Sequence, residues 1–377
     1  MAATNPPVSG DCSLWPLWRQ YRSAVLQADG RVVDFKFDNG VTTSEGQAYS
    51  LFFALLADDH DAFQTILNWT SDHLAQGDLG RRLPAWQWGQ LPSGTWGIRD
   101  STPAADADMW LAYTLIEAGR IWHRPDYDAM GRNLLRQVAR LETVYLPEFG
   151  WMILPAPEGF ALPGNRWRLN PSYLPLPLLR AFSRVDPTGP WNAIAQNLVR
   201  MVSAVAPHGV LPDWVIYEAG SGWRSDPDKG TLGSYDAIRV YLWAGMTAPG
   251  DPHRARLMQA TGGLARFLDR HAQIPEKIDA RTGQPPQPGN ARYIAAPPGF
   301  ASALLPYLDG TGQRAQWRVW HQRIRGDLAR GVGAVGAPLH YYDLALSLFG
   351  LGWQEQRFRF DASGELLRKA KAAPCAG

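Results

Sequence analysis

The chain has 377 residues, of which 45% are hydrophobic and 19% are charged, and its formal net charge is +2. This composition is typical of a globular protein and excludes a disordered or fibrous chain. The nearly balanced charge contains no basic block of the kind that binds nucleic acid or an anionic membrane. No stretch approaches the roughly 20 apolar residues of a membrane-spanning helix.

The N-terminal segment MAATNPPVSG has neither a basic leader nor an apolar core, so it is not a signal peptide as written. Two interpretations stay open: a cytosolic protein, or a mature exported chain whose leader has been replaced by Met1. The two cysteines, Cys12 and Cys375, lie near opposite ends of the chain. A disulfide between them would need an oxidising compartment, and two unpaired thiols explain the sequence equally well.

Apolar periodicity and stop signals predict about twelve helices. The expected ranges are 12–28, 43–58, 60–75, 106–123, 125–141, 172–184, 188–206, 233–247, 252–270, 298–309, 312–330 and 338–351. They form consecutive pairs separated by longer loops rich in Trp, Gly and Pro, and the best of the few strand-like runs are 151–154 and 214–217.

Six helical hairpins with few strands predict an all-α fold, an (α/α)6 barrel in which inner helices alternate with outer ones. Such a barrel has a cleft at one end, where the termini of the inner helices meet long loops. An irregular bundle or an α-solenoid is the alternative, but no fixed repeat period supports a solenoid. We expect residues 1–377 to form one domain, with residues 1–11 as a flexible N-terminus.

Tryptophan is unusually frequent, with 17 residues beside 13 Tyr and 13 Phe. Trp110 and Trp243 lie within predicted helices and are expected in the core. Many others lie in loops, where flat rings suit the apolar faces of sugars, although they would suit other ligands too. The predicted substrate contacts, which lie between helical pairs, are Trp88, Trp96 and Trp167.

Glu45 opens the predicted helix 43–58 in the segment TTSEGQAYS. Thr42 and Glu45 have the S/T-x-x-E spacing of a capping box, in which the glutamate binds a backbone N–H group. Spacing alone therefore favours a structural role for Glu45.

Asp106 and Asp108 begin the predicted helix 106–123. Because helical residues two apart do not face the same way, we expect one to point inward and the other to cap the helix or face solvent.

Asp236 lies in the first turn of the predicted helix 233–247, with Ser234 as the expected N-cap. Arg239 follows three residues later, close enough to hold the Asp236 carboxylate and keep it ionised. An ordinary ion pair at a helix N-terminus is the alternative interpretation.

These acids begin three helices in matching hairpin positions, so they gather at one mouth if those helices form the inner ring. Sites that accept such repulsion are often functional. A glycosidase needs one protonated acid and one ionised base, about 6.5–9.5 Å apart if the configuration inverts. A helix N-terminus favours the charged form, so we expect partial desolvation or an ionised Asp106 to raise the pKa of Glu45.

At these residues the sequence resembles glycoside hydrolase family 8, a family of bacterial endoglucanases with an (α/α)6 barrel. The family signature begins A-[ST]-D-[AG]-D, and a helix with an alanine and a closing tryptophan follows. The matching residues are Ala104-Ala105-Asp106-Ala107-Asp108, then Ala112, Ala118 and Trp122, with departures at Ala105, Leu111 and Thr114.

The resemblance implies that Glu45 is the proton donor and Asp236 the base of an inverting reaction. Such a reaction has no covalent intermediate, so Asp106 is expected to hold the distorted sugar and tune Glu45. The segment NPSY implies that the Tyr173 hydroxyl lies near the attacking water, and Tyr235 and Arg239 neighbour the base. No cofactor is expected, and eight scattered histidines show no metal-ligand spacing; His340 is expected to be a core or surface residue.

Asp236 favours the glucanase branch over the chitosanase-like branch of the family. Four further segments are CSLWP from Cys12, RLPAWQWG (82–89), PDWVIYE (212–218) and RFRF (357–360). With them, the resemblance over nearly all of the chain is strongest to the periplasmic endoglucanases encoded with bacterial cellulose synthase. This implies cellulose as substrate, a periplasmic or secreted location, a bridge between Cys12 and Cys375, and an association with the synthase complex. The alternatives are a family 8 xylanase, a mixed-linkage β-glucanase, or a non-catalytic glucan-binding protein.

Overall fold

The computed structural model describes residues 15–36, 40–286, 293–330 and 340–369. Cys12, Cys375 and the expected flexible segment 1–11 lie outside these ranges, so the predicted bridge stays a prediction. Within the described residues, no helix is long and apolar enough to cross a membrane.

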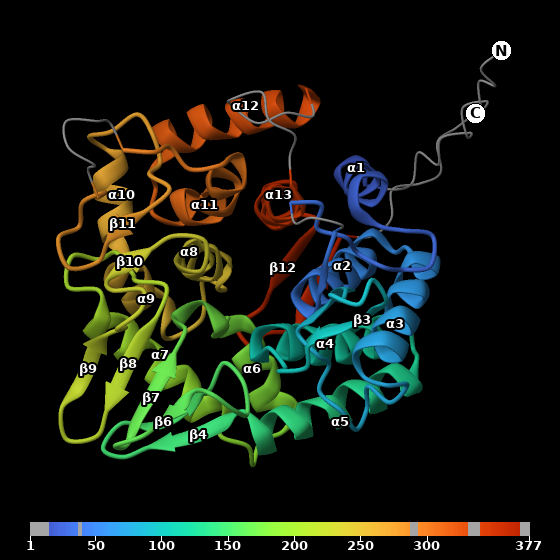
Figure 1. Cartoon of the computed structure of the whole chain (residues 1–377). Coiled ribbons are helices and arrows are strands. Elements are labelled where there is room, and N and C mark those ends of the chain that lie inside the picture. Colours follow the sequence, from blue (N-terminus) through green and yellow to red (C-terminus); the bar gives the residue numbers. More distant parts are fainter. Residues whose placement is uncertain (1–14, 37–39, 287–292, 331–339, 370–377) are drawn as a thin grey trace.

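A closed ring of helices forms the centre of the molecule (Figure 1). Each inner helix contacts the next, and the last contacts the first, which closes the ring. Going round, the inner helices are α2 (Ser44–Ala57), α4 (Ala105–Ile121), α6 (Leu176–Val185), α8 (Ala237–Met246), α11 (Pro298–Gly310) and α13 (Tyr341–Gln354).

A second layer of helices packs outside the ring, most of them against an inner partner. The outer helices are α1 (Pro16–Val25), α3 (His60–Leu74), α5 (Pro125–Leu141), α7 (Trp191–Val205), α9 (Arg254–Ala260), α10 (Gly262–Leu268) and α12 (Arg314–Arg330). The predicted (α/α)6 barrel is confirmed. Its first outer helix, α1, packs against the last inner helix, α13.

The sequence patterns explain which helices lie inside. Helix α5 buries Tyr127, Gly131, Leu134, Leu135 and Val138, the one-sided stripe of an outer helix. Helix α2 is apolar on all sides, and its residues are buried except at its second position, as expected for a helix enclosed by neighbours.

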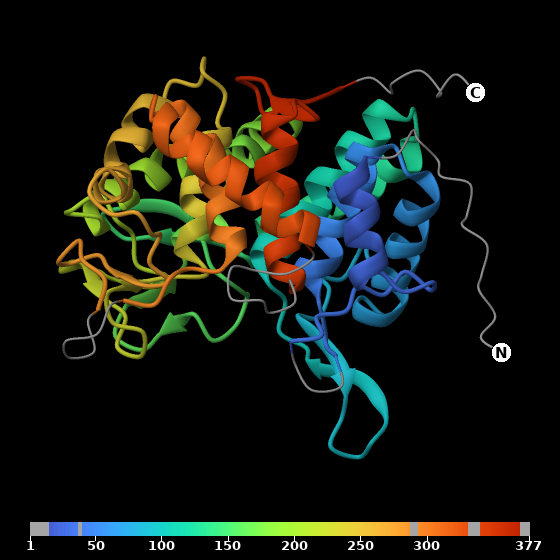
Figure 2. The same cartoon turned by 90° about the horizontal axis from the view of Figure 1, so that it is seen from above.

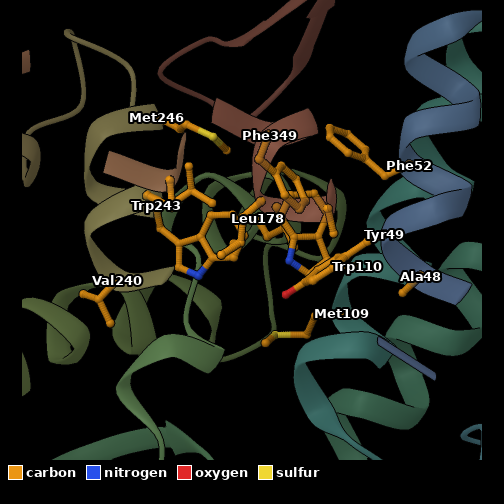
Figure 3. Packing of buried hydrophobic residues seen from close by; sticks show 14 of the residues in the cluster. Ala48, Tyr49, Phe52, Met109, Trp110, Leu178, Val240, Trp243, Met246 and Phe349 are labelled. Atoms are coloured by element: carbon orange, nitrogen blue, oxygen red, sulfur yellow. The ribbon is translucent and has the colours of Figure 1, made fainter. Parts of the chain in front are cut away.

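Aromatic rings fill the middle of the barrel (Figure 3). Trp110 and Trp243 are 5.4 Å apart between ring centroids, and Phe349 packs against both. Both tryptophans are buried, which confirms the core position expected for them. Glycine allows inner helices to approach closely: a Cβ on Gly350 of α13 would lie 1.9 Å from the Ser302 carbonyl oxygen of α11.

The loops contain short strands. The predicted strand runs 151–154 and 214–217 are confirmed within one residue as β5 (Gly150–Ile153) and β8 (Val215–Glu218). Three antiparallel sheets are β1 (Thr42–Thr43), β2 (Gln87–Gln90) and β3 (Trp96–Asp100); β4 (Thr143–Leu146) and β5 (Gly150–Ile153); β6 (Ala161–Leu162), β7 (Arg166–Leu169), β8 (Val215–Glu218) and β9 (Gly222–Ser225). Two further pairs are β10 (Leu232–Gly233) with β11 (Ile278–Asp279), and β12 (Phe358–Phe360) with β13 (Leu366–Arg368).

Several predicted helices have different bounds in the structure, and two of the differences have a clear cause. The range 252–270 divides at Thr261 into α9 and α10, where Gly263 approaches the His208 carbonyl so closely that a Cβ would lie 2.0 Å from the oxygen. The range 172–184 begins as a 3-10 turn at Pro171–Tyr173 and becomes α-helical only at Leu176. Pro175 disfavours the α-helical conformation at Leu174, whose φ and ψ are −119° and 66°, and thereby delays the helix.

Candidate active site

A cleft of about 430 Å³ lies where the N-terminal ends of the inner helices meet. This volume is within the range of small-molecule sites. The lining residues are Asp34, Lys36, Thr43, Glu45, Trp86, Ala104, Asp106, Tyr173, Trp214, Tyr235, Asp236, Arg239, Pro297, His340, Tyr341, Tyr342 and Asp343. The three predicted acids, from α2, α4 and α8, therefore converge on one cleft.

Glu45 projects into the cleft because another residue caps its helix. The N-cap of α2 is Thr43, whose side chain accepts a hydrogen bond from the Gly46 N–H at 3.1 Å. The Thr42 hydroxyl instead donates to the Val32 carbonyl at 2.7 Å. The capping box expected between Thr42 and Glu45 is therefore wrong, and the carboxylate of Glu45 bonds to groups of the cleft.

Arg239 joins all three acids through one buried guanidinium. Its Nη1 donates to Glu45 Oε2 at 2.5 Å and to Asp106 Oδ2 at 2.9 Å, and its Nη2 donates to Asp236 Oδ1 at 2.7 Å. The hydroxyls of Tyr49 and Ser172 accept further hydrogen bonds from it at 3.0 Å each. One cation thus offsets part of the repulsion among three carboxylates.

Asp236 occupies the N-cap position of α8, and the predicted pair with Arg239 is confirmed. Ser234, the expected N-cap, has a different role: its hydroxyl donates to the Glu276 carbonyl at 2.7 Å. The side chain of Asp236 is 28% exposed, compared with 3% for Arg239, so its carboxylate faces the open cleft.

Asp106 and Asp108 point to different surroundings, but neither faces solvent. Asp106 Oδ1 accepts a hydrogen bond from the Ala107 N–H at 2.8 Å, and its other oxygen contacts Arg239. Asp108 is fully buried beside Glu142, the C-cap residue of α5. The expectation that one of the pair caps or faces solvent is wrong, because the other side of α4 is also core.

Tyrosines at the start of α13 complete the wall beside Glu45. The Tyr341 hydroxyl donates to Glu45 Oε1 at 3.1 Å, and the Tyr342 hydroxyl donates to the Tyr235 carbonyl at 2.6 Å. Tyr235 and Tyr173 both line the cleft, as predicted. His340, expected elsewhere, is the N-cap residue of α13 and lines the cleft too, because every inner helix begins at this end.

The predicted tryptophan contacts lie outside the lining of the cleft. Trp88 and Trp96 stack at 5.2 Å in the β2–β3 hairpin, which projects from the helical body (Figure 2), and the Arg31 guanidinium lies within 4.8 Å of both rings. Trp167 is half-buried against Tyr217. The tryptophans that do line the cleft are Trp86 and Trp214, so contact of the other three with substrate stays a prediction.

Burial raises the pKa of Glu45 to about 7, and the negative charges of Asp106 and Asp236 act in the same direction. Arg239 and the Tyr341 hydroxyl oppose this rise. Burial also raises the pKa of Asp106, against the effect of Arg239. The sequence predicted the two causes for Glu45, desolvation and Asp106, and both contribute. A carboxyl group that holds its proton near neutral pH can serve as a general acid.

Comparison with known proteins assigns the family. The model of glycosyl hydrolases family 8 matches residues 7–356. The chain belongs to glycoside hydrolase family 8. An endoglucanase of Xanthomonas axonopodis pv. citri is 44% identical over 365 residues, which cover 97% of this chain and 92% of that protein. An endoglucanase of Salmonella typhi is 44% identical over 356 residues, with coverages of 94% and 91%.

The solved structure of endo-1,4-D-glucanase from Vibrio fischeri ES114 is also similar, with a TM-score of 0.87 and 38% identity. The alignment covers 94% of this chain and 99% of the Vibrio fischeri chain. The family 8 assignment agrees with the place of the signature, whose segment 104–108 begins α4 at the cleft.

Several residues that line this family 8 cleft were not predicted from the sequence. Trp86 and Trp214 lie in loops, but they were not among the predicted substrate contacts. Tyr341 and Tyr342 lie near the start of the predicted helix 338–351, and the expectation that inner helices begin at the cleft could have identified them. Lys36, which lies 5.1 Å from the Tyr235 ring, carries no comparable signal. Among the described residues, no group of three or more His, Cys, Asp or Glu side chains could hold a metal ion.

Proposed function

We propose that this family 8 protein is an endo-β-1,4-glucanase that hydrolyses cellulose with inversion of configuration. The observation that carries the proposal is the meeting of Glu45, with a pKa near 7, and Asp236 at one guanidinium in an open cleft. The relatives named endoglucanases, 44% identical over nearly the whole chain, support the same activity.

In this mechanism Glu45 gives its proton to the glycosidic oxygen as the bond to the anomeric carbon breaks. Asp236 takes a proton from a water molecule, whose oxygen attacks the anomeric carbon from the opposite face of the sugar. Asp106 and Arg239 keep the two carboxyl groups apart and oriented, and Tyr173 helps to place the water. The products are two shorter chains, and the new reducing end has the α configuration.

The same proposal extends to the setting of the enzyme. We expect a periplasmic or secreted protein that acts on β-1,4-glucan chains, in association with the cellulose synthase complex. The sequence resemblance to endoglucanases encoded with that synthase supports this part of the proposal.

The test is NMR of the anomer released from cellopentaose by wild type, Glu45→Gln and Asp236→Asn. Wild type should release the α-anomer first, and each variant should lose at least about 1,000-fold in kcat, since both groups take part in proton transfer. Glu218→Gln, on β8 outside the cleft lining, is the matched control and should keep wild-type kcat.

Other outcomes separate the alternatives. Release of the β-anomer would contradict inversion. Faster turnover of xylan than of carboxymethyl-cellulose would indicate a family 8 xylanase. Faster turnover of mixed-linkage glucan than of carboxymethyl-cellulose would indicate a mixed-linkage β-glucanase. Binding of cellopentaose by wild type and Glu45→Gln alike, with hydrolysis by neither, would indicate a glucan-binding protein.

A further inference from the structure

At the start of α8, the residue in the N-cap position does not cap the helix with its side chain. Asp236 occupies the N-cap position, where an aspartate ordinarily accepts a hydrogen bond from a backbone N–H of the first turn. Its side chain makes no such bond and reaches Arg239 instead. The first N–H groups of a helix have no partner within the helix, so another acceptor is needed.

Asp213, which lies in the loop before β8, supplies that acceptor. Its Oδ1 accepts hydrogen bonds from the Ser234 N–H and the Ala237 N–H, both at 2.7 Å. These two amides flank Asp236 in the sequence. One carboxylate oxygen therefore fixes the backbone on both sides of Asp236.

The backbone around Asp213 is itself held against α8. The Asp213 N–H donates to the Leu232 carbonyl at 2.9 Å, and the Leu211 N–H donates to the Tyr241 hydroxyl of α8 at 3.2 Å. Gly233 lies so close that a Cβ there would be 1.8 Å from the Leu211 carbonyl oxygen. Segment 211–213 and the turn before α8 thus form one close-packed unit.

We propose that Asp213 is the positioning residue for Asp236: it caps α8 in place of Asp236, which leaves the Asp236 carboxylate free to face the cleft. The inference deepens the proposed function, because it rests on Asp236 acting as the base. Asp213 is not part of the cleft lining and touches no reacting group. It acts only through the backbone that carries Asp236.

The charge of Asp213 is separate from its capping role. Burial raises the pKa of Asp213 to about 6, and the nearby Asp236 acts in the same direction, while the two N–H groups and Arg239 oppose the rise. Asparagine keeps the acceptor oxygen without the charge, and leucine removes both. A comparison of Asp213→Asn with Asp213→Leu therefore isolates the hydrogen bonds.

The experiment measures kcat and KM on cellopentaose, together with melting temperature. Asp213→Leu should lower kcat about 100-fold, the effect of a misplacement near 1 Å, and leave KM within about threefold, because cleft contacts with the sugar remain. Asp213→Asn should keep kcat within about fivefold of wild type. In an Asp236→Asn background, Asp213→Leu should lower kcat little further, because the carboxylate that Asp213 positions is already absent.

The matched control is Asp361→Leu. Asp361 Oδ1 also accepts two backbone N–H groups, from Ser363 and Glu365 at 2.9 Å each, but it lies in the β12–β13 turn at the other end of the barrel. It should keep wild-type kcat. If Asp213→Leu does not fold, Asp213→Glu replaces it, since an added methylene displaces the acceptor; we expect at least a tenfold loss of kcat.

Wild-type kcat in Asp213→Leu or Asp213→Glu would overturn this inference alone, provided that Asp236→Asn is inactive. Equal losses in Asp213→Asn and Asp213→Leu would also overturn it, because charge and not capping would then matter. Wild-type activity in Asp236→Asn would overturn both this inference and the assigned base.

Discussion

Arg239 determines the charge balance of the cleft at the level of single residues. It is the partner of Glu45, Asp106 and Asp236, and its side chain is almost completely buried. A guanidinium presents several donors in a fixed plane, so it can bind separate carboxylates at once, whereas a lysine would offer a single point charge. Even so, one positive charge cannot balance three negative ones, and the most favourable solution is for one acid to keep a proton.

The first prediction concerns the proton on Glu45. Because the hydrogen bond from Tyr341 stabilises ionised Glu45, Tyr341→Phe should raise the pKa of Glu45 above its value near 7. The active form is the protonated one, so kcat/KM should fall with rising pH through about 7 in wild type. In Tyr341→Phe this limb should move to higher pH by up to about one unit, since a hydrogen bond to a charged group contributes roughly 1.5 kcal/mol.

The measurement is the pH dependence of kcat/KM on a soluble cello-oligosaccharide. Tyr342→Phe is the matched control, because its hydroxyl donates to a backbone carbonyl and not to Glu45. A basic limb that stays in place, or moves to lower pH, in Tyr341→Phe would count against Glu45 as the acid.

Part of this site was predictable from local spacing, and part was not. Asp236 and Arg239 are three residues apart on one helix, so their contact follows from helix geometry. The contacts of Arg239 with Glu45 and Asp106 join residues separated by 194 and 133 positions. They depend on how the ring closes, which spacing does not reveal. The family resemblance placed these acids together, but the tryptophans that line the cleft were determined by loop conformation.

At the scale of elements, a buried pair of carboxyl groups joins α4 to the end of α5. Asp108 and Glu142 are both inaccessible to solvent, and their side chains interact with each other. Burial raises the pKa of both well above the ordinary range. The charge of Asp108 raises the pKa of Glu142 further, whereas the hydrogen bond from Glu142 lowers the pKa of Asp108. The pair therefore holds protons, one of which can be shared between the two side chains.

The second prediction follows from this linkage. A carboxyl whose pKa is raised in the folded state stabilises the fold below its ordinary value, 4.5 for Glu142, and loses that contribution as pH rises toward the folded value. Glu142→Gln removes one such group but keeps a hydrogen-bond partner for Asp108. Relative to wild type, the free energy of unfolding of Glu142→Gln should rise by up to about 1.4 kcal/mol for each pH unit above 4.5.

Urea unfolding of wild type, Glu142→Gln and the exposed control Glu148→Gln at several pH values would measure this difference. Glu148→Gln should follow wild type at every pH. Parallel curves for wild type and Glu142→Gln would contradict a protonated pair.

Most helices were predictable as elements because each has a strong apolar pattern, whether one-sided or continuous. The exceptions have causes outside the helix itself. The division of 252–270 at Thr261 comes from the approach of Gly263 to a loop more than fifty residues earlier, a contact that no window of sequence contains. The late start of α6 was easier to predict, because Pro175 disfavours a helical conformation in the residue before it.

On the scale of the whole molecule, the first and last helices close the barrel together. Helix α1 packs against α13, and α13 contacts α2, so the wall that holds Tyr341 beside Glu45 depends on the first helix. The sequence predicted the ring but not this pairing, because consecutive helices predict neighbours in the chain and give no information on which helix the first one meets.

The last prediction tests how strongly this closure stabilises the barrel. Trp18 of α1 is fully buried, stacks on Tyr21, and donates from Nε1 to Asp59 Oδ2 at 2.9 Å. Its replacement removes core packing and leaves a buried carboxylate oxygen with fewer partners. Trp18→Ala should therefore lower the free energy of unfolding by about 3–5 kcal/mol. Trp151→Ala is the matched control, since that ring is 39% exposed and its loss should cost less than about 1 kcal/mol.

Both variants should keep wild-type kcat in the absence of urea, because neither ring lines the cleft. If the ring unfolds as one unit, intrinsic fluorescence and endoglucanase activity should be lost over the same urea range in Trp18→Ala, at a lower midpoint than in wild type. Equal midpoints for Trp18→Ala and Trp151→Ala would mean that the first helix adds little to closure. The wall beside Glu45 would then be stabilised by the inner ring alone.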